Sequence, residues 1–204
     1  MDHLLIDGPS DADATVVLAH GAGAGMEHAF LHAVAEGLAD RGLCVVRFEF
    51  PYMQARRAGR CPGPDRLPVL QDAYRAVVRA QSAPIVLAGK SMGGRVATTI
   101  ADELGVLAVV VFGYPFHPPK QPTKLRTAHL EGLQTPTLIL QGERDPFGTP
   151  AEVAGYELSP SIELCWLEDG DHSLQPRKRS GFTEQGHLAT AIDRAFAFVQ
   201  AQLA

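Results

Sequence analysis

Ser91 stands in a pentapeptide whose other two small residues are glycines at fixed spacing. Gly89–Gly93 reads G-K-S-M-G and directly follows the apolar run Pro84–Ala88. A tight strand-to-helix turn requires small residues at both glycine positions, and it holds the serine hydroxyl up from the sheet. This spacing predicts a nucleophile at Ser91. An ordinary helix N-cap is the alternative role for the same serine.

A serine nucleophile needs a base to accept its proton and an acid to orient that base. Asp145 follows the apolar run Thr137–Leu140, and His172 follows Ile162–Leu167. Both positions are predicted loops at the edge of the sheet that also carries Ser91. We therefore predict Asp145 as the acid and His172 as the base, although an Asp-Pro pair can also simply initiate a turn.

Two other acidic residues compete with Asp145 for the orienting role. Asp169 and Asp171 lie on the same short loop as His172. Backbone geometry makes it awkward for either side chain to reach Nδ1 of a histidine on its own loop. We therefore interpret both as loop structure or solvated charge.

An acyl-transfer site also needs N–H groups for the oxyanion. His20–Gly25 reads H-G-A-G-A-G, and its small residues let backbone amides approach a substrate closely. We predict the N–H groups of Ala22 and Met92 as the donors. A dinucleotide loop is disfavoured because Met26 breaks its glycine spacing, and a phosphate loop because Pro84 replaces its first glycine.

Alternating apolar runs and helical periodicities predict an α/β fold with a mostly parallel, doubly wound sheet of about six to seven strands. Carboxyl ends of parallel strands share one edge, where ligands bind. The expected strands are Leu4–Ile6, Thr15–Ala19, Leu43–Phe48, Pro84–Ala88, Val106–Phe112, Thr137–Leu140 and Ile162–Leu167. The expected helices are Ala29–Ala39, Val69–Ala80, Val96–Leu104, Leu125–Leu133 and Ala189–Leu203. The longest irregular stretches should be Pro51–Leu67, Gly113–Thr123 and Asp169–Glu184.

Composition limits the other possibilities. The 204 residues, 46% hydrophobic, suit one domain spanning 1–204. The net charge of −5 argues against nucleic-acid partners, and no apolar run approaches the roughly 20 residues of a membrane span. Met1–Asp7 lacks a secretory n-region, and the three cysteines (Cys44, Cys61 and Cys165) are widely spaced, so we expect a cytoplasmic protein with reduced thiols. No spacing predicts a metal or cofactor, and the oligomeric state stays open.

Six motifs together carry a resemblance. They are His20–Gly25, Arg47–Met53, Gly89–Arg95, Gly113–Pro119, Gln141–Gly148 and Asp169–His172. They resemble the small bacterial α/β-hydrolases that share a domain with a testis-expressed protein and with a scaffold subunit of the eukaryotic NSL histone-acetyltransferase complex. The resemblance covers nearly the whole chain. It implies an α/β-hydrolase fold with Ser91, Asp145 and His172 as the triad, and it implies no particular substrate.

The shape of the substrate pocket can be predicted from the lack of a segment long enough to form a cap domain. Only Gly113–Thr123 is available for a cap domain, and its four prolines keep it extended. We therefore expect no cap domain, and a shallow, open cleft that prefers esters of about two to four acyl carbons because a longer chain finds little apolar surface there. Its predicted walls are Tyr52, Met53, Tyr114, Phe116, His117 and Phe147.

Two functions remain open at this point. The first is a serine hydrolase that cleaves carboxylic ester or thioester bonds of a small molecule through an acyl-enzyme. The second is a non-catalytic binding or scaffold module that retains the fold, against which an intact triad argues. The basic clusters Arg56–Arg60 and Arg177–Arg179 form either a cationic rim or, as we prefer, solvated surface. The pattern assigns no role to Lys90.

Overall fold

The computed structural model describes residues 4–82 and 84–204. Met1–His3, on which the expected cytoplasmic location partly depends, lie outside these residues. The described chain contains a sheet of seven strands in the order β1-β3-β2-β4-β5-β6-β7. Only β1 at one edge runs antiparallel to its neighbour. The strands are β1 (Leu4–Asp7), β2 (Thr15–Ala19), β3 (Cys44–Phe48), β4 (Ile85–Lys90), β5 (Ala108–Phe112), β6 (Thr137–Gly142) and β7 (Ile162–Leu167).

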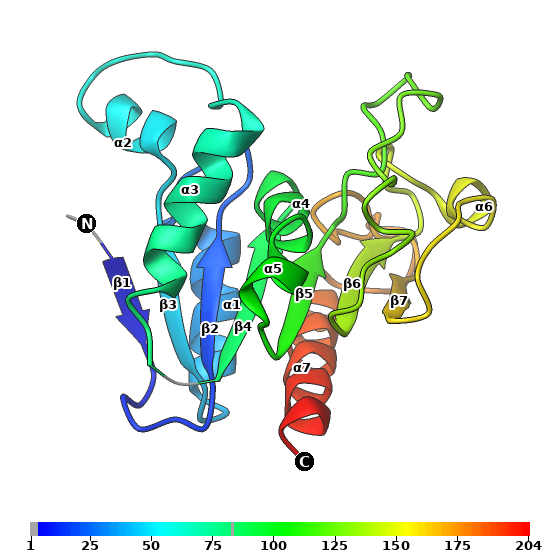
Figure 1. The fold of residues 1–204 in the computed structure, drawn as a ribbon. Coiled ribbons are helices and arrows are strands. Elements are labelled where there is room, and N and C mark those ends of the chain that lie inside the picture. Colours follow the sequence, from blue (N-terminus) through cyan, green and yellow to red (C-terminus); the bar gives the residue numbers. More distant parts are fainter. Residues whose placement is uncertain (1–3, 83) are drawn as a thin grey trace.

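Helices cover both faces of this sheet (Figure 1). They are α1 (Ala29–Ala39), α2 (Pro51–Arg57), α3 (Leu67–Val78), α4 (Met92–Thr98), α5 (Ala101–Leu104), α6 (Pro150–Val153) and α7 (Glu184–Leu203). The predicted α/β fold, the doubly wound sheet and the edge strand at the start of the chain are confirmed. No helix of the described residues is both long and apolar enough to cross a membrane.

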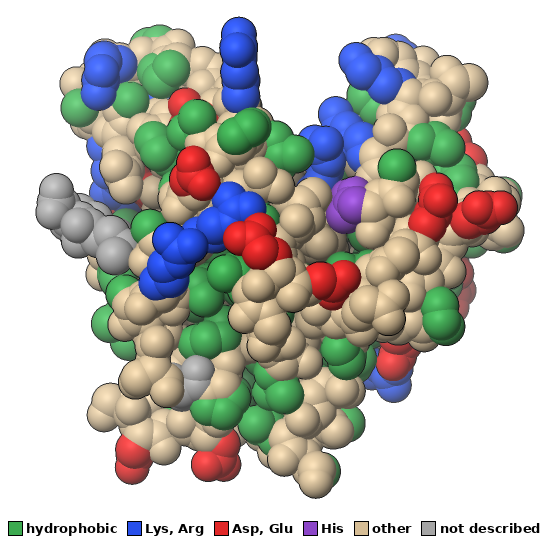
Figure 2. Space-filling model, in the orientation of Figure 1, with side chains coloured by type: hydrophobic (Ala, Val, Ile, Leu, Met, Phe, Trp, Pro, Cys, Tyr) green, Lys and Arg blue, Asp and Glu red, His purple; other side chains and the backbone are tan. Residues whose placement is uncertain are grey.

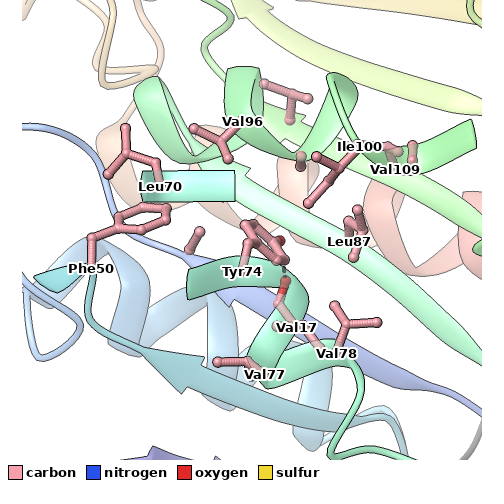
Figure 3. Close-up of a cluster of buried hydrophobic side chains, with 14 of the residues drawn as sticks. Val17, Phe50, Leu70, Tyr74, Val77, Val78, Leu87, Val96, Ile100 and Val109 are labelled. Carbon is pink, nitrogen blue, oxygen red and sulfur yellow. Dashed lines mark hydrogen bonds between the residues drawn. The ribbon is translucent and has the colours of Figure 1, made fainter. Parts of the chain in front are cut away.

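Each face of the sheet has its own apolar core. On one face α3 and α4 pack over the central strands, with Tyr74 at the centre of the cluster in Figure 3. The hydroxyl of Tyr74 donates to the carbonyl of Val17 at 2.6 Å and accepts from the N–H of Ala88 at 3.1 Å. On the other face α1 and α7 pack together over the same strands. The carboxyl ends of β2, β4 and β5 therefore emerge between two layers of helices.

The helix predicted at Leu125–Leu133 is wrong, because this segment is irregular. Its apolar periodicity comes from Leu130 and Leu133, which are buried in the core beside α4. The N–H of Arg126 donates to the carbonyl of Phe116 at 2.8 Å, which ties the segment to the loop after β5 rather than to its own preceding turn. Tertiary burial has overridden the helical pattern here. No cap domain is inserted between β5 and β6 in the described chain.

Several element boundaries also differ from the prediction, and two of these differences have a clear local cause. The stretch Pro51–Leu67 begins with the helix α2, whose first residue is a proline with a preset helical φ. The predicted helix Val96–Leu104 is divided into α4 and α5. The hydroxyls of Thr98 and Thr99 donate to carbonyls three residues earlier at 2.9 and 2.7 Å, and such local bonds compete with regular helix.

Candidate active site

Ser91 lies in the turn between β4 and α4 with φ 52° and ψ −112°. This is a strained backbone for a residue with a side chain, and it is typical of functional positions. The flanking glycines make the turn possible. A Cβ at Gly93 would lie 2.6 Å from the carbonyl oxygen of Ala19, and a Cβ at Gly89 would collide with the backbone of Gly94. The predicted turn is therefore present, with its hydroxyl at the carboxyl edge of the sheet.

His172 joins Ser91 to Asp145. Its Nε2 lies 2.8 Å from Oγ of Ser91, and its Nδ1 lies 2.7 Å from Oδ2 of Asp145. Because a carboxylate only accepts, Nδ1 carries the hydrogen and Nε2 is left to accept from the serine hydroxyl. The ring of Phe147 covers one side of the imidazole, with ring centroids 4.2 Å apart. The structure thus brings together all three residues that the sequence singled out.

Asp145 is fully buried, so its carboxylate needs several donors. Besides His172, the N–H of Phe147 donates to Oδ1 at 2.9 Å and the amide of Gln141 donates to Oδ2 at 2.9 Å. The amide of Gln141 is held in turn, because its oxygen accepts from the N–H of Tyr114 at 2.6 Å. Sequence reasoning gave Gln141 no role. A glutamine within the apolar strand β6 was the signal that it missed.

The competing acids have other partners. Asp171 accepts from the N–H groups of Ser173 and Gln175 at 2.7 and 3.0 Å, which shapes the loop. Asp169 accepts from Nε of Arg177 at 2.7 Å, and this side-chain bonding lowers the pKa of Asp169 to about 2. Neither carboxylate is hydrogen-bonded to the imidazole. Both lie where the sequence interpretation put them, as structural parts of the loop.

The loop His20–Gly25 packs directly against the nucleophile. A Cβ at Gly21 would lie 3.7 Å from Cβ of Ser91. The buried ring of His20 supports this loop, because its Nε2 accepts from the N–H of Phe50 at 3.1 Å, and burial lowers the pKa of His20. Within the described residues, the N–H groups of Ala22 and Met92 donate to no protein acceptor. Both therefore remain available to a bound ligand.

Lys90 connects the turn between β4 and α4 to the loop that carries His172. Its Nζ donates to the carbonyl oxygen of His172 at 2.5 Å and lies 5.8 Å from the centroid of the Phe30 ring. Burial lowers the pKa of Lys90 to about 8, opposed by the attraction of Asp145. Lys90, to which the sequence assigned no role, thus holds the backbone of His172 close to Ser91.

A cavity of about 860 Å³ opens beside Ser91 and His172. It lies on the α1 and α7 side of the sheet, and much of its wall is apolar. Its apolar wall includes Ala29, Phe30, Ala33, Phe147 and Leu188. A space of this size is typical of a small-molecule site. The expectation of a shallow cleft too small for a long acyl chain is therefore wrong.

Most of the predicted pocket walls are wrong as well. Phe147 lines the cavity, but the other five predicted residues are buried and lie outside its lining: Tyr52, Met53, Tyr114, Phe116 and His117. The four apolar or aromatic residues among them, Tyr52, Met53, Tyr114 and Phe116, belong to the core on the α3 and α4 side, where burial of large side chains stabilises the fold. The Tyr52 hydroxyl does contact the His20–Gly25 loop, since it donates to the carbonyl oxygens of Gly21 and Ala22 at 3.1 Å each.

One arginine of each basic cluster is paired with acidic neighbours. Arg57 pairs with Glu49 at 2.7 Å and with Glu27 at 2.6 Å. Arg177 pairs with Asp169. These pairs support solvated surface over a cationic rim. Among the described residues, no group of three or more His, Cys, Asp or Glu side chains could share a metal ion.

Comparison with known proteins gives one family and several similar folds. A family model described as an alpha/beta hydrolase domain matches residues 12–200. Est1E from Butyrivibrio proteoclasticus is 16% identical with a TM-score of 0.74, over 98% of this chain and 93% of that one. The esterase domain from a Rhodothermus marinus protein is 17% identical with a TM-score of 0.70, over 98% and 92% of the two chains.

A third similar structure is a serine hydrolase from Xanthomonas campestris that is described as having no lid. It is 21% identical with a TM-score of 0.66, over 98% of this chain and 86% of that one. At these identities the likeness shows the fold, while function has to be argued from the site.

Proposed function

We propose that this chain, which belongs to the alpha/beta hydrolase domain family, is a serine hydrolase that cleaves carboxylic ester or thioester bonds. The observation that carries the proposal is the continuous hydrogen-bond chain from Ser91 through His172 to Asp145. Nucleophile, base and acid stand in the relative positions that acyl transfer requires. The unengaged N–H groups of Ala22 and Met92 beside the nucleophile support the same chemistry.

The reaction proceeds in two halves. Oγ of Ser91 attacks the carbonyl carbon while Nε2 of His172 takes its proton, and Asp145 stabilises the imidazolium. The N–H groups of Ala22 and Met92 bind the oxyanion. When the tetrahedral intermediate collapses, His172 returns the proton to the leaving alcohol or thiol, and the acyl group stays on Ser91.

Water then completes the cycle. It attacks the acyl carbon, His172 accepts one of its protons, and collapse of the second intermediate returns that proton to Ser91 as the free acid leaves. The chemistry uses no metal ion or cofactor, because the imidazole moves every proton and backbone amides hold the charge. The cavity beside α1 and α7 would hold the acyl chain, since its wall is largely apolar.

The resemblance of the sequence motifs to one group of small hydrolases supports catalysis over a structural role. The motifs His20–Gly25, Gly89–Arg95 and Asp169–His172 resemble those of the small bacterial hydrolases related to the testis-expressed protein and the NSL scaffold subunit. A scaffold would have no physical need for a strained elbow or an aligned triad. We therefore favour catalysis over a purely structural role, in the cytoplasm, on a small-molecule substrate.

A fluorophosphonate probe tests the proposal directly. The purified protein should be labelled at Ser91 and should hydrolyse activated aryl esters, whereas Ser91→Ala should do neither while retaining its thermal unfolding temperature. Loss of the nucleophile should reduce kcat by several orders of magnitude. Absence of both labelling and turnover in the folded wild-type protein would favour the binding module instead.

A further inference from the structure

Arg95 and Arg126 differ from the other partly buried arginines of the described chain. Neither guanidinium donates a hydrogen bond to a described residue, and neither lies within 4.0 Å of a described carboxylate. Nε of Arg95 is buried without any partner. The remaining partly buried arginines all donate to protein acceptors: Arg41, Arg47, Arg56, Arg75 and Arg144. A buried cationic donor without an acceptor is costly.

The two arginines come from α4 and from the irregular segment after β5, which pack against each other. The N–H of Arg95 donates to the carbonyl of Ser91 at 2.9 Å, so this residue lies one helical turn along α4 from the nucleophile. Arg126 lies on the irregular segment after β5, where its carbonyl accepts from the hydroxyl of Tyr114 at 2.8 Å. His129 joins the two segments, because its Nε2 lies 2.9 Å from the hydroxyl of Thr98 on α4.

Charges in this cluster repel one another. Burial and the neighbouring Arg95 lower the pKa of Arg126. The same two causes lower the pKa of His129 to about 4, so its ring is neutral near pH 7. The two guanidinium groups are therefore close enough to repel each other, and the His129 ring near them is neutral. An anion that accepts from both would remove the repulsion and supply the missing acceptors.

Figure 2 shows that the surface is hollowed at the top of the molecule, over the carboxyl ends of the strands, and that Lys and Arg side chains and a histidine lie along this hollow. α4 belongs to the face of the sheet opposite to α1 and α7. Arg95, one turn of α4 beyond Ser91, and the apolar cavity therefore lie on opposite faces of the sheet. One substrate that spans Ser91 could therefore place an apolar acyl chain on one side and an anionic group on the other.

We propose that Arg95 and Arg126 form an anion-binding subsite for the leaving group of the substrate. The substrate is then an ester or thioester whose acyl part is apolar and whose alcohol or thiol part carries a carboxylate or a phosphate. This assignment rests on the proposed hydrolase function, because it identifies which half of the substrate lies over α4. The planar guanidinium fork suits both oxyanions.

Three octanoyl esters test the subsite, with para-hydroxybenzoate, para-hydroxyphenyl phosphate and the neutral isostere para-hydroxybenzamide as leaving groups. Each kcat/KM is divided by the rate of the same ester with hydroxide, which removes intrinsic reactivity. The wild-type enzyme should prefer an anionic ester over the amide by tenfold or more, as expected for charge-assisted hydrogen bonds. Preference for the benzoate alone identifies a carboxylate ligand, and preference for the phosphate alone identifies a phosphate ligand.

The variants are Arg95→Gln, Arg126→Gln and the matched control Arg79→Gln. Arg79 is exposed and lies at the end of α3, so its variant removes one positive charge outside the cluster. The anionic preference should fall to within about twofold of unity in the first two variants and persist in the control. Equal preference in all three variants, or no anionic preference in the wild type, would overturn the assignment.

A binding measurement separates this inference from the proposed function. Calorimetric titration of Ser91→Ala with para-hydroxybenzoate and with inorganic phosphate requires no turnover. At least one anion should bind, and adding Arg126→Gln should weaken its binding by tenfold or more. If activated esters are not hydrolysed but this loss is seen, the proposed function fails and the anion site stands. If the two proteins bind both anions equally, the anion site fails whatever the activity.

Discussion

The substitution Ala33→Leu tests whether the cavity beside α1 holds the acyl chain. Ala33 lines this cavity, which measures about 860 Å³. Each methylene that is transferred from water to an apolar wall stabilises the complex by about 0.8 kcal/mol, or roughly fourfold in kcat/KM. The wild-type enzyme should therefore prefer octanoyl over acetyl esters, the reverse of the preference for short esters that the sequence suggested.

The magnitude follows from the three carbons that leucine adds to alanine. They occupy space that about three methylenes of the acyl chain would fill, so the octanoyl ester should lose about 2 kcal/mol, roughly 30-fold in kcat/KM. The acetyl ester fills little of the cavity and should lose much less. The assay is a series of para-nitrophenyl esters from acetate to dodecanoate, measured at substrate concentrations well below KM.

Ala201→Leu is the matched control, because this alanine is exposed near the end of α7 and lies outside the cavity wall. Its chain-length profile should match that of the wild type. The reasoning is refuted if Ala33→Leu lowers kcat/KM equally for all chain lengths, or if the wild-type enzyme shows no gain between butyrate and octanoate.

Four other predictions concern the triad, the elbow lysine, the core and metal dependence. Asp145→Asn should lower kcat by about a thousandfold or more because the histidine loses its tautomer, whereas Asp171→Asn should cost far less; the opposite ranking in ester assays would reassign the acid. Burial lowers the pKa of Lys90 from 10.5 to about 8, so the unfolded chain binds more protons there between these pH values, and the contribution of this lysine to stability should rise with pH across that window. Urea unfolding of Lys90→Met should show a smaller rise, and an unchanged pH dependence would exclude a depressed pKa. Tyr74→Phe should lower the free energy of unfolding by about 1 to 3 kcal/mol, since it removes the buried hydroxyl that bonds to Val17 and Ala88, while the partly exposed Tyr156→Phe should cost less; equal losses would contradict this account. Dialysis against EDTA should leave ester hydrolysis unchanged, and recovery only with a divalent ion would disprove the metal-free mechanism.

The fold class and the three residues of the hydrogen-bond chain could be predicted from the sequence alone. Ser91 could be singled out because the turn around it depends on local sterics, which the glycines at 89 and 93 report directly. Asp145 and His172 followed from strand order, since the carboxyl ends of parallel strands meet at one edge. Each of these inferences needs only neighbouring residues and general rules of topology.

The surroundings of these three residues could not be predicted, because they depend on tertiary packing. The segment 125–133 has a helical pattern but packs as an irregular loop, and the aromatic residues expected in the pocket are buried in the core instead. Arg57 and Arg177 form ion pairs with carboxylates, while Arg95 and Arg126 form none with the described residues. Such outcomes depend on side chains far apart in sequence that compete for the same space and charge, and no local pattern records the result of that competition.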